Sequence, residues 1–250
     1  MEAHVLAPGR GWQWIIEGFG LFRKNPLIWI VLSAALFAIA VGLGLIPVLG
    51  PLVFYLLSPI FLAGLMLACR ALEKGDEIEI AHLFAGFRVN TSQLITIGGI
   101  YLIGQIVIYG VLIVIGGSAI TAMMGGMGSA DIAAMPNAMS EMMLALMIAL
   151  ALSVPLMMAI WFAPLLVVFD NAPALAAVKL SFAACLKNIL PFTVYGLAIF
   201  VLGVIAAIPF GLGLLVLIPT IFGSIYASYK DVFAVSEPGG QMLIGDSELP

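Results

Sequence analysis

Two long stretches of the chain, 25–69 and 188–229, are apolar and contain no Asp, Glu, Lys or Arg. A membrane-spanning helix needs about 20 apolar residues, so each stretch is long enough for two such helices. Each stretch is also interrupted by proline and glycine, at 47–51 and at 209–211, and proline disrupts the interior of a helix. The pattern therefore predicts four spans, at about 27–46, 52–69, 191–208 and 212–229.

Two further apolar stretches lie between these and predict one span each. The first covers about 94–117. The second covers about 142–168 and includes Pro155 and Pro164. We expect these prolines to kink the helix without ending it, because neighbouring helices can satisfy the freed backbone groups. The predicted fold class is an all-α membrane protein with six transmembrane helices arranged as three hairpins.

A charged segment with an apolar stripe at helical spacing precedes each hairpin. The three stripes are Trp12, Ile15, Ile16, Phe19 and Phe22; Ile80, Leu83, Phe84 and Phe87; and Leu175, Val178, Phe182 and Leu186. These segments are too charged to span the bilayer and apolar enough to lie flat in its interface as amphipathic helices. Each ends in a basic residue and an asparagine, and asparagine favours the start of a new helix. The pattern indicates three repeated units. The alternative is that short loops between spans produce similar sequence features without a repeat.

The composition and the placement of charge support this topology. Apolar residues make up 64% and charged residues 9% of the chain, whereas a soluble domain carries about 25% charged residues. All nine Lys and Arg residues fall on one side of the six predicted spans, and the opposite loops carry only Asp131 and Glu141. By the positive-inside rule the basic side is cytoplasmic. We therefore expect a multi-pass protein of the bacterial inner membrane with both termini in the cytoplasm, a single membrane domain at 1–233 and a disordered cytoplasmic tail at 234–250.

Six short segments carry a resemblance to a known family. They are GWQW (11–14), FRKNPL (22–27), ACRAL (68–72), HLFAGFR (82–88), AVKLS (177–181) and YASYKDVF (226–233). Together they resemble a proteobacterial family of six-span inner-membrane proteins of uncharacterised biochemistry, over nearly the whole chain apart from 118–140 and the tail after Phe233. More loosely, the chain is similar to the membrane domains fused to some glycerophosphodiester phosphodiesterases. Because no hydrolase domain follows the spans, we expect no such activity here.

The predicted spans contain no charged side chain. Ion pathways and acid–base catalysis usually need buried ionisable residues. His4 and His82 lie outside the spans, with no Ser or Cys at a spacing typical of a catalytic or zinc site. Cys69 and Cys185 each lie beside a basic residue at a span end, and we expect them to be reduced thiols that pack as small apolar residues. The sequence therefore predicts no enzyme and no catalytic, cofactor or metal site.

The most polar stripe within a predicted span consists of Tyr101, Gln105 and Tyr109, which follow one another at helical spacing. The plainer interpretation is hydrogen bonding between helices, in which Gln105 finds a partner on the second or fourth span. The sharper interpretation is a stripe that contacts a substrate. The two differ in whether Gln105 faces another helix or a polar cavity.

Methionines gather between residues 118 and 147. They are Met123, Met124, Met127, Met135, Met139, Met142, Met143 and Met147. Thioethers favour Cu(I), so a copper-handling loop on the periplasmic side is one interpretation. The region contains no His or Cys, and methionine is a common flexible apolar filler. We favour the filler interpretation.

Two functions fit these features. We favour a non-enzymatic inner-membrane protein that organises the lipid bilayer or binds lipids or membrane-protein partners, using its interfacial helices. The alternative is a carrier for a small apolar or zwitterionic solute, which would use Gln105 and the proline-kinked spans. No basic cluster is dense enough to indicate a nucleic-acid partner.

Overall fold

The computed structural model describes residues 2–124 and 135–233, and these form helices joined by short connections. In chain order the elements are α1 (Arg10–Lys24), α2 (Pro26–Gly44), α3 (Leu49–Lys74), the 3-10 helix η1 (Ile80–Arg88), α4 (Thr91–Met124), α5 (Met135–Trp161), α6 (Ala163–Asp170), α7 (Ala174–Lys187), α8 (Ile189–Ala207) and α9 (Leu214–Val232). The described residues contain no β-strand. The all-α prediction is therefore confirmed for this part of the chain.

Five helical segments within the described residues are long and apolar enough to cross a membrane. They are Pro26–Gly44, Leu49–Lys74, Thr91–Gly117, Met139–Asp170 and Ile189–Ala207. They correspond to the first five predicted spans. The sixth predicted span forms α9, but the last turns of α9 contain Tyr226, Tyr229, Lys230 and Asp231, which lower its hydropathy. The arrangement of six spans in three hairpins stays a prediction.

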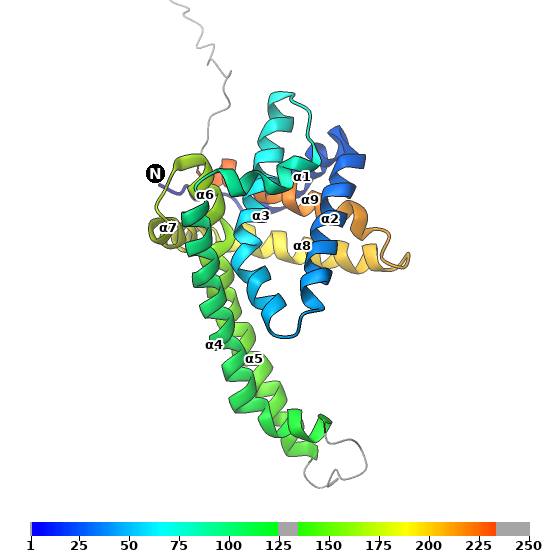
Figure 1. Cartoon of the computed structure of the whole chain (residues 1–250), viewed down its shortest axis with the longest axis vertical. Helices are drawn as coiled ribbons and strands as arrows, with labels where there is room; N and C mark the ends of the chain where they lie inside the picture. Colours follow the sequence, from blue (N-terminus) through cyan, green and yellow to red (C-terminus); the bar gives the residue numbers. More distant parts are fainter. Residues whose placement is uncertain (1, 125–134, 234–250) are drawn as a thin grey trace, which may run out of the picture.

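The helical hairpins do not all point the same way (Figure 1). The hairpin of α2 and α3 runs downward in this view, with its connection at the lower end, and the longer helices α4 and α5 also run downward beside each other. The helices α8 and α9 instead run across the view, and their connection lies at the right-hand side. α9 packs mainly along α1 and only briefly against α8. The third hairpin is thus arranged differently from the first two.

The fourth predicted span is interrupted between α5 and α6. Pro164 lies in the first turn of α6, where its missing N–H costs nothing. At the break, the Ser181 hydroxyl accepts a hydrogen bond from the Phe162 N–H at 2.9 Å and donates one to the Met158 carbonyl at 2.7 Å. In an unbroken helix these two backbone groups would bond each other. The helix is therefore broken just before Pro164, whereas Pro155 lies within α5. The two parts together still form one candidate span, Met139–Asp170.

The three asparagines that follow the predicted interfacial helices have different roles. Asn25 caps α2, because its side chain accepts from the Ile28 N–H at 3.5 Å. The Asn90 amide instead donates to the Val167 carbonyl at 3.0 Å, which ties the start of α4 to α6. Asn188 is fully buried, and its amide donates to the His4 carbonyl at 2.8 Å. Only the first acts through its side chain as the predicted helix cap.

All three predicted interfacial segments are helical, although the second is a 3-10 helix. On α1 the predicted stripe divides into a buried part, which includes Ile15 and Phe22, and an exposed part. The exposed part consists of Trp12, Ile16 and Phe19. One face of α1 is therefore bound within the protein, while a second apolar face is open to the surroundings.

Candidate functional site

The first helix lies against α8 and α9 at backbone contact. A Cβ atom added at Gly18 would lie 2.4 Å from the Thr220 carbonyl oxygen and 2.5 Å from the Ser224 nitrogen. A Cβ added at Gly11 would lie 2.2 Å from the Pro191 carbonyl oxygen. Only glycine permits these approaches. α1 is thus a packed structural element as well as an amphipathic helix.

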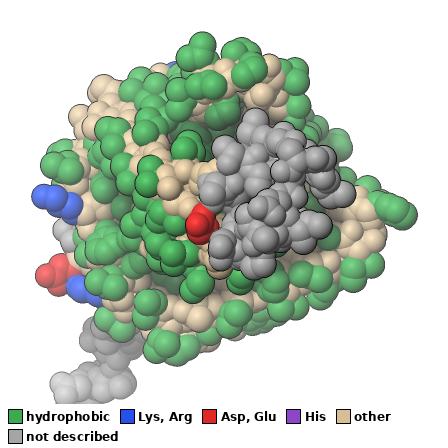
Figure 2. Space-filling model, turned by 90° about the horizontal axis from the view of Figure 1, so that it is seen from below, with side chains coloured by type: hydrophobic (Ala, Val, Ile, Leu, Met, Phe, Trp, Pro, Cys, Tyr) green, Lys and Arg blue, Asp and Glu red, His purple; other side chains and the backbone are tan. Residues whose placement is uncertain are grey.

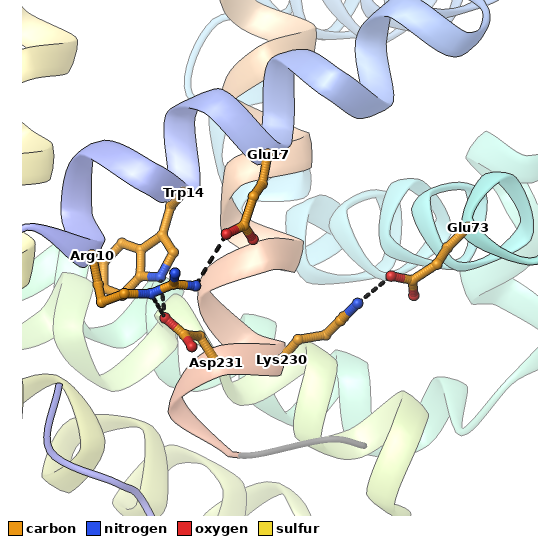
Figure 3. A network of polar contacts seen from close by, with 6 residues as sticks. All are labelled: Arg10, Trp14, Glu17, Glu73, Lys230 and Asp231. Atoms are coloured by element: carbon orange, nitrogen blue, oxygen red, sulfur yellow. Dashed lines mark hydrogen bonds and ion pairs between the residues drawn. The ribbon is translucent and has the colours of Figure 1, made fainter. Parts of the chain in front are cut away.

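The carboxylate of Asp231, near the end of α9, holds the start of α1 (Figure 3). Its Oδ2 accepts from Arg10 Nε at 2.6 Å and from Trp14 Nε1 at 2.9 Å. Arg10 also bonds the Glu17 carboxylate at 3.0 Å. The hydrogen bond from Arg10 to Asp231 is the largest cause that raises the pKa of the guanidinium above its ordinary value. The two helices are therefore joined by an ion pair and by an indole hydrogen bond.

A second set of contacts joins α9 to the end of α3. Glu73 pairs with Lys230 (Figure 3), and it also accepts a hydrogen bond from the Tyr226 hydroxyl at 2.7 Å. Lys24, at the end of α1, donates to the Leu72 carbonyl at 3.0 Å. These contacts bring the ends of α1, α3 and α9 together.

A third contact extends this arrangement to α6. The Tyr229 hydroxyl donates to Asp170 Oδ2 at 2.5 Å, and the guanidinium of Arg70 lies over the Phe169 ring, 5.3 Å from its centroid. We call the whole set the α9 polar cluster; its members are Arg10, Trp14, Glu17, Glu73, Asp170, Tyr226, Tyr229, Lys230 and Asp231. In this cluster every carboxylate has a basic or hydroxyl donor.

The chemistry available to the α9 polar cluster is that of a structural clamp. Its carboxylates accept from Arg, Lys, Trp and Tyr side chains that come from other turns or other helices. Across residues 2–124 and 135–233, no three His, Cys, Asp or Glu side chains are grouped so that they could hold a metal ion. Sequence reasoning used these charged residues only as markers of orientation and missed that they pair.

The predicted polar stripe on α4 lies partly against α3. The Tyr109 and Tyr55 hydroxyls are 2.8 Å apart, and the Tyr101 ring meets the Tyr55 ring edge-on with centroids 5.4 Å apart. Gln105 is half-buried, and among the described residues its amide has no hydrogen-bond partner. Tyr55 could have been anticipated as a polar residue on the second span. The partner predicted for Gln105 on the second or fourth span is not found in the described part.

The cysteines and methionines of the sequence are accounted for only in part. Cys69 and Cys185 are both buried free thiols, as expected, and burial raises the pKa of the Cys185 thiol to about 12. The copper interpretation rests largely on Met123, Met124 and Met127, whose side chains lie outside the described residues. It stays untested.

An apolar groove of about 480 Å³ lies between α1, α8 and the first half of α9. Its walls include Trp12, Ile16 and Phe19 of α1, Leu202 and Ile205 of α8, and Val216 of α9. The volume falls within the range of roughly 300–1,000 Å³ that is typical of ligand sites. The sequence indicated the α1 wall as an amphipathic stripe but could not indicate the helices that face it.

Comparison with known proteins identifies a relative that aligns over nearly the whole chain. The chain is 31% identical, over 99% of its own length and the whole length of the relative, to a probable inner membrane protein of Burkholderia thailandensis. No protein-family model matches the sequence. No solved structure matches it either.

Proposed function

The chain belongs to the family of that Burkholderia inner membrane protein, and from this premise we propose a non-enzymatic role in organising the lipid around it. In this proposal the sixth predicted span is α9, both termini are cytoplasmic, and the amphipathic helices lie in the cytoplasmic interface. The protein itself is a multi-pass helical membrane protein, with five apolar helices long enough to span among the described residues. Membrane-protein partners are compatible with this role.

The observation that carries the proposal is the contrast between the α9 polar cluster and the rest of the surface. Within the cluster the two basic side chains, Arg10 and Lys230, are paired with the carboxylates of Glu17, Asp231 and Glu73. Seen from below, hydrophobic side chains cover most of the described surface and charged side chains are few (Figure 2). An apolar surface of this kind is solvated by lipid tails. Lipid is therefore the ligand that this surface fits best.

The topology in this proposal is tested by reporter fusions. Fusions after Lys74, after Lys179 and at the C-terminus should report a cytoplasmic location, and a fusion near Ala130 should report a periplasmic one. The reason is that all nine basic residues fall on one side of the six predicted spans. The measurement is the ratio of alkaline phosphatase to green fluorescent protein activity at each site. A periplasmic C-terminus would contradict an even number of spans.

A carrier function is the second candidate. The observation that favours it is the amide of Gln105, which has no partner among the described residues. A polar amide within hydrocarbon needs a partner or water. Against this, the residues one turn before and after Gln105 on the same face of α4 include Leu102 and Ile108, which are apolar, and Ile108 is buried. We therefore expect no water-filled cavity beside Gln105.

The two candidates are separated by a cysteine substitution in α4. We expect Gln105→Cys, in a protein with Cys69 and Cys185 replaced by alanine, to react slowly with a small polar thiol reagent added from either side of the membrane. The measurement is the labelled fraction against time in sealed vesicles. A cysteine after Lys74, outside the span, is the positive control. Rapid labelling of the Gln105→Cys variant from one side would overturn the lipid-organising proposal in favour of the carrier.

A further inference from the structure

The groove between α1, α8 and α9 is an apolar site left by the way the three helices meet. At one end α8 and α9 are close, because a Cβ added at Gly213 would lie 2.5 Å from the Ala206 Cα. Farther along α9, Gly18 of α1 lies against Thr220 and Ser224. Between these two points the helices diverge, and their side chains leave the groove of about 480 Å³.

The lining of the groove selects an apolar occupant. Its residues are hydrophobic apart from Gly213 and Thr220, and the Thr220 hydroxyl donates to the Val216 carbonyl of its own helix at 2.7 Å. The indole of Trp12 and the side chains of Ile16 and Phe19 are exposed along the α1 wall. A hydrocarbon chain can pack against such a surface without losing any hydrogen bond, whereas a polar solute would lose its hydrogen bonds to water.

A basic side chain lies beside this groove, near the C-terminal end of α1. The guanidinium of Arg23 lies 5.9 Å from the centroid of the Phe19 ring, and Phe19 is a wall residue. Arg23 is exposed, and within the described part of the chain it forms no ion pair. A guanidinium presents a planar set of donors that matches a phosphate. The site therefore combines an apolar groove with a cation that can bind phosphate, and this cation lies on α1, the helix that forms one wall of the groove.

We propose that this groove binds one acyl chain of an anionic phospholipid, with the lipid phosphate held by Arg23. The proposal rests on the lipid-organising function and names the lipid class and the site. It also explains why α1 keeps an apolar face exposed although its opposite face is packed: the exposed face completes a lipid site.

The test uses the full chain purified in a mild detergent and supplied with phosphatidylglycerol or phosphatidylethanolamine. Native mass spectrometry counts the lipids retained. We expect the wild-type protein to retain phosphatidylglycerol preferentially, and Arg23→Gln to weaken that retention about tenfold, the order expected for loss of a hydrogen bond between charged groups. Ile16→Trp, which fills the groove, should lower retention of both lipids.

Matched variants control for general effects of charge and bulk. Lys179→Gln removes an exposed basic residue from α7, and Ile103→Trp enlarges an exposed apolar residue of α4; both should retain phosphatidylglycerol as the wild type does. Equal retention by wild type, Arg23→Gln and Ile16→Trp would overturn the proposed site while leaving the general function standing. If the wild type retains neither lipid, the lipid-organising function itself fails. A complex of higher mass, with a second copy of the chain or another protein, that disappears in Ile16→Trp would show that a protein occupies the groove. That result would also overturn the lipid site.

Discussion

Gly18→Ala should destabilise the protein strongly, although alanine is the better helix former. The new Cβ would meet the Thr220 carbonyl oxygen at 2.4 Å and the Ser224 nitrogen at 2.5 Å. Both are backbone atoms of α9 and cannot move aside as the end of a side chain can. α1 must therefore shift as a whole, and overpacking of this kind costs about 1–3 kcal/mol. We expect a clearly lower melting temperature in detergent, measured by tryptophan fluorescence.

Gly20→Ala is the matched control on the same helix. Gly20 has no atom within 4 Å of the position of an added Cβ, so alanine fits without a clash. Alanine is favoured over glycine in a helix by about 1 kcal/mol, and this variant should be neutral or slightly more stable. Gly18→Ala should thus lower the melting temperature, whereas Gly20→Ala should leave it unchanged or raise it slightly. Equal melting temperatures would show that α1 does not rest on α9 through Gly18.

The helices themselves could be predicted from the sequence because they depend on local signals. The uncharged stretches predict α2, α3 and α8. The break at 209–211 lies in the connection between α8 and α9, and the break at 47–51 overlaps the end of the connection before α3, which begins at Leu49. The helical stripe before the first span predicts α1. These features need only the spacing of apolar residues and the positions of proline.

The packing of α1 on α9 could not be predicted, because it joins residues about two hundred positions apart in the sequence. Gly11 and Gly18 are seven residues apart and occupy one face of α1. This spacing is a signal of close helix contact that is independent of the apolar stripe. Even so, the glycines do not indicate which helix they contact.

The polar end of α9 shows what hydropathy leaves out of a correctly predicted helix. Residues 212–229 are uncharged, and hydropathy predicts a simple span. In the structure Ser224 and Ser228 are buried and bond carbonyls of their own helix, and Tyr229 reaches Asp170. The helix is therefore suited to contact other helices along its length, which hydropathy alone does not reveal.

Ser181 provides a further example on the predicted fourth span. The sequence predicts that the two prolines there act alike, since each removes one N–H. The structure ends a helix only near Pro164, where the Ser181 hydroxyl from α7 stands between the Phe162 N–H and the Met158 carbonyl. The outcome depends on a partner from another helix, so the identity of the proline does not determine it.

Asp231→Ala should destabilise the protein strongly. It removes the acceptor of both Arg10 and Trp14, and Trp14 is fully buried. An indole N–H left without a partner and a lost charged hydrogen bond together cost about 2–3 kcal/mol. Glu17→Ala removes the other partner of Arg10, which is exposed, and should cost less than about 1 kcal/mol.

A double-mutant cycle shows whether the indole hydrogen bond is the reason. Trp14→Phe keeps an aromatic ring beside Phe192 and Tyr195 but removes the N–H. In this background Asp231→Ala should cost less than in the wild type, because no buried donor is then left without its acceptor. Thermal unfolding of the four proteins in the same detergent gives the coupling energy. If Asp231→Ala costs the same in both backgrounds, Asp231 acts on stability through Arg10 alone, and the indole contributes only its packing.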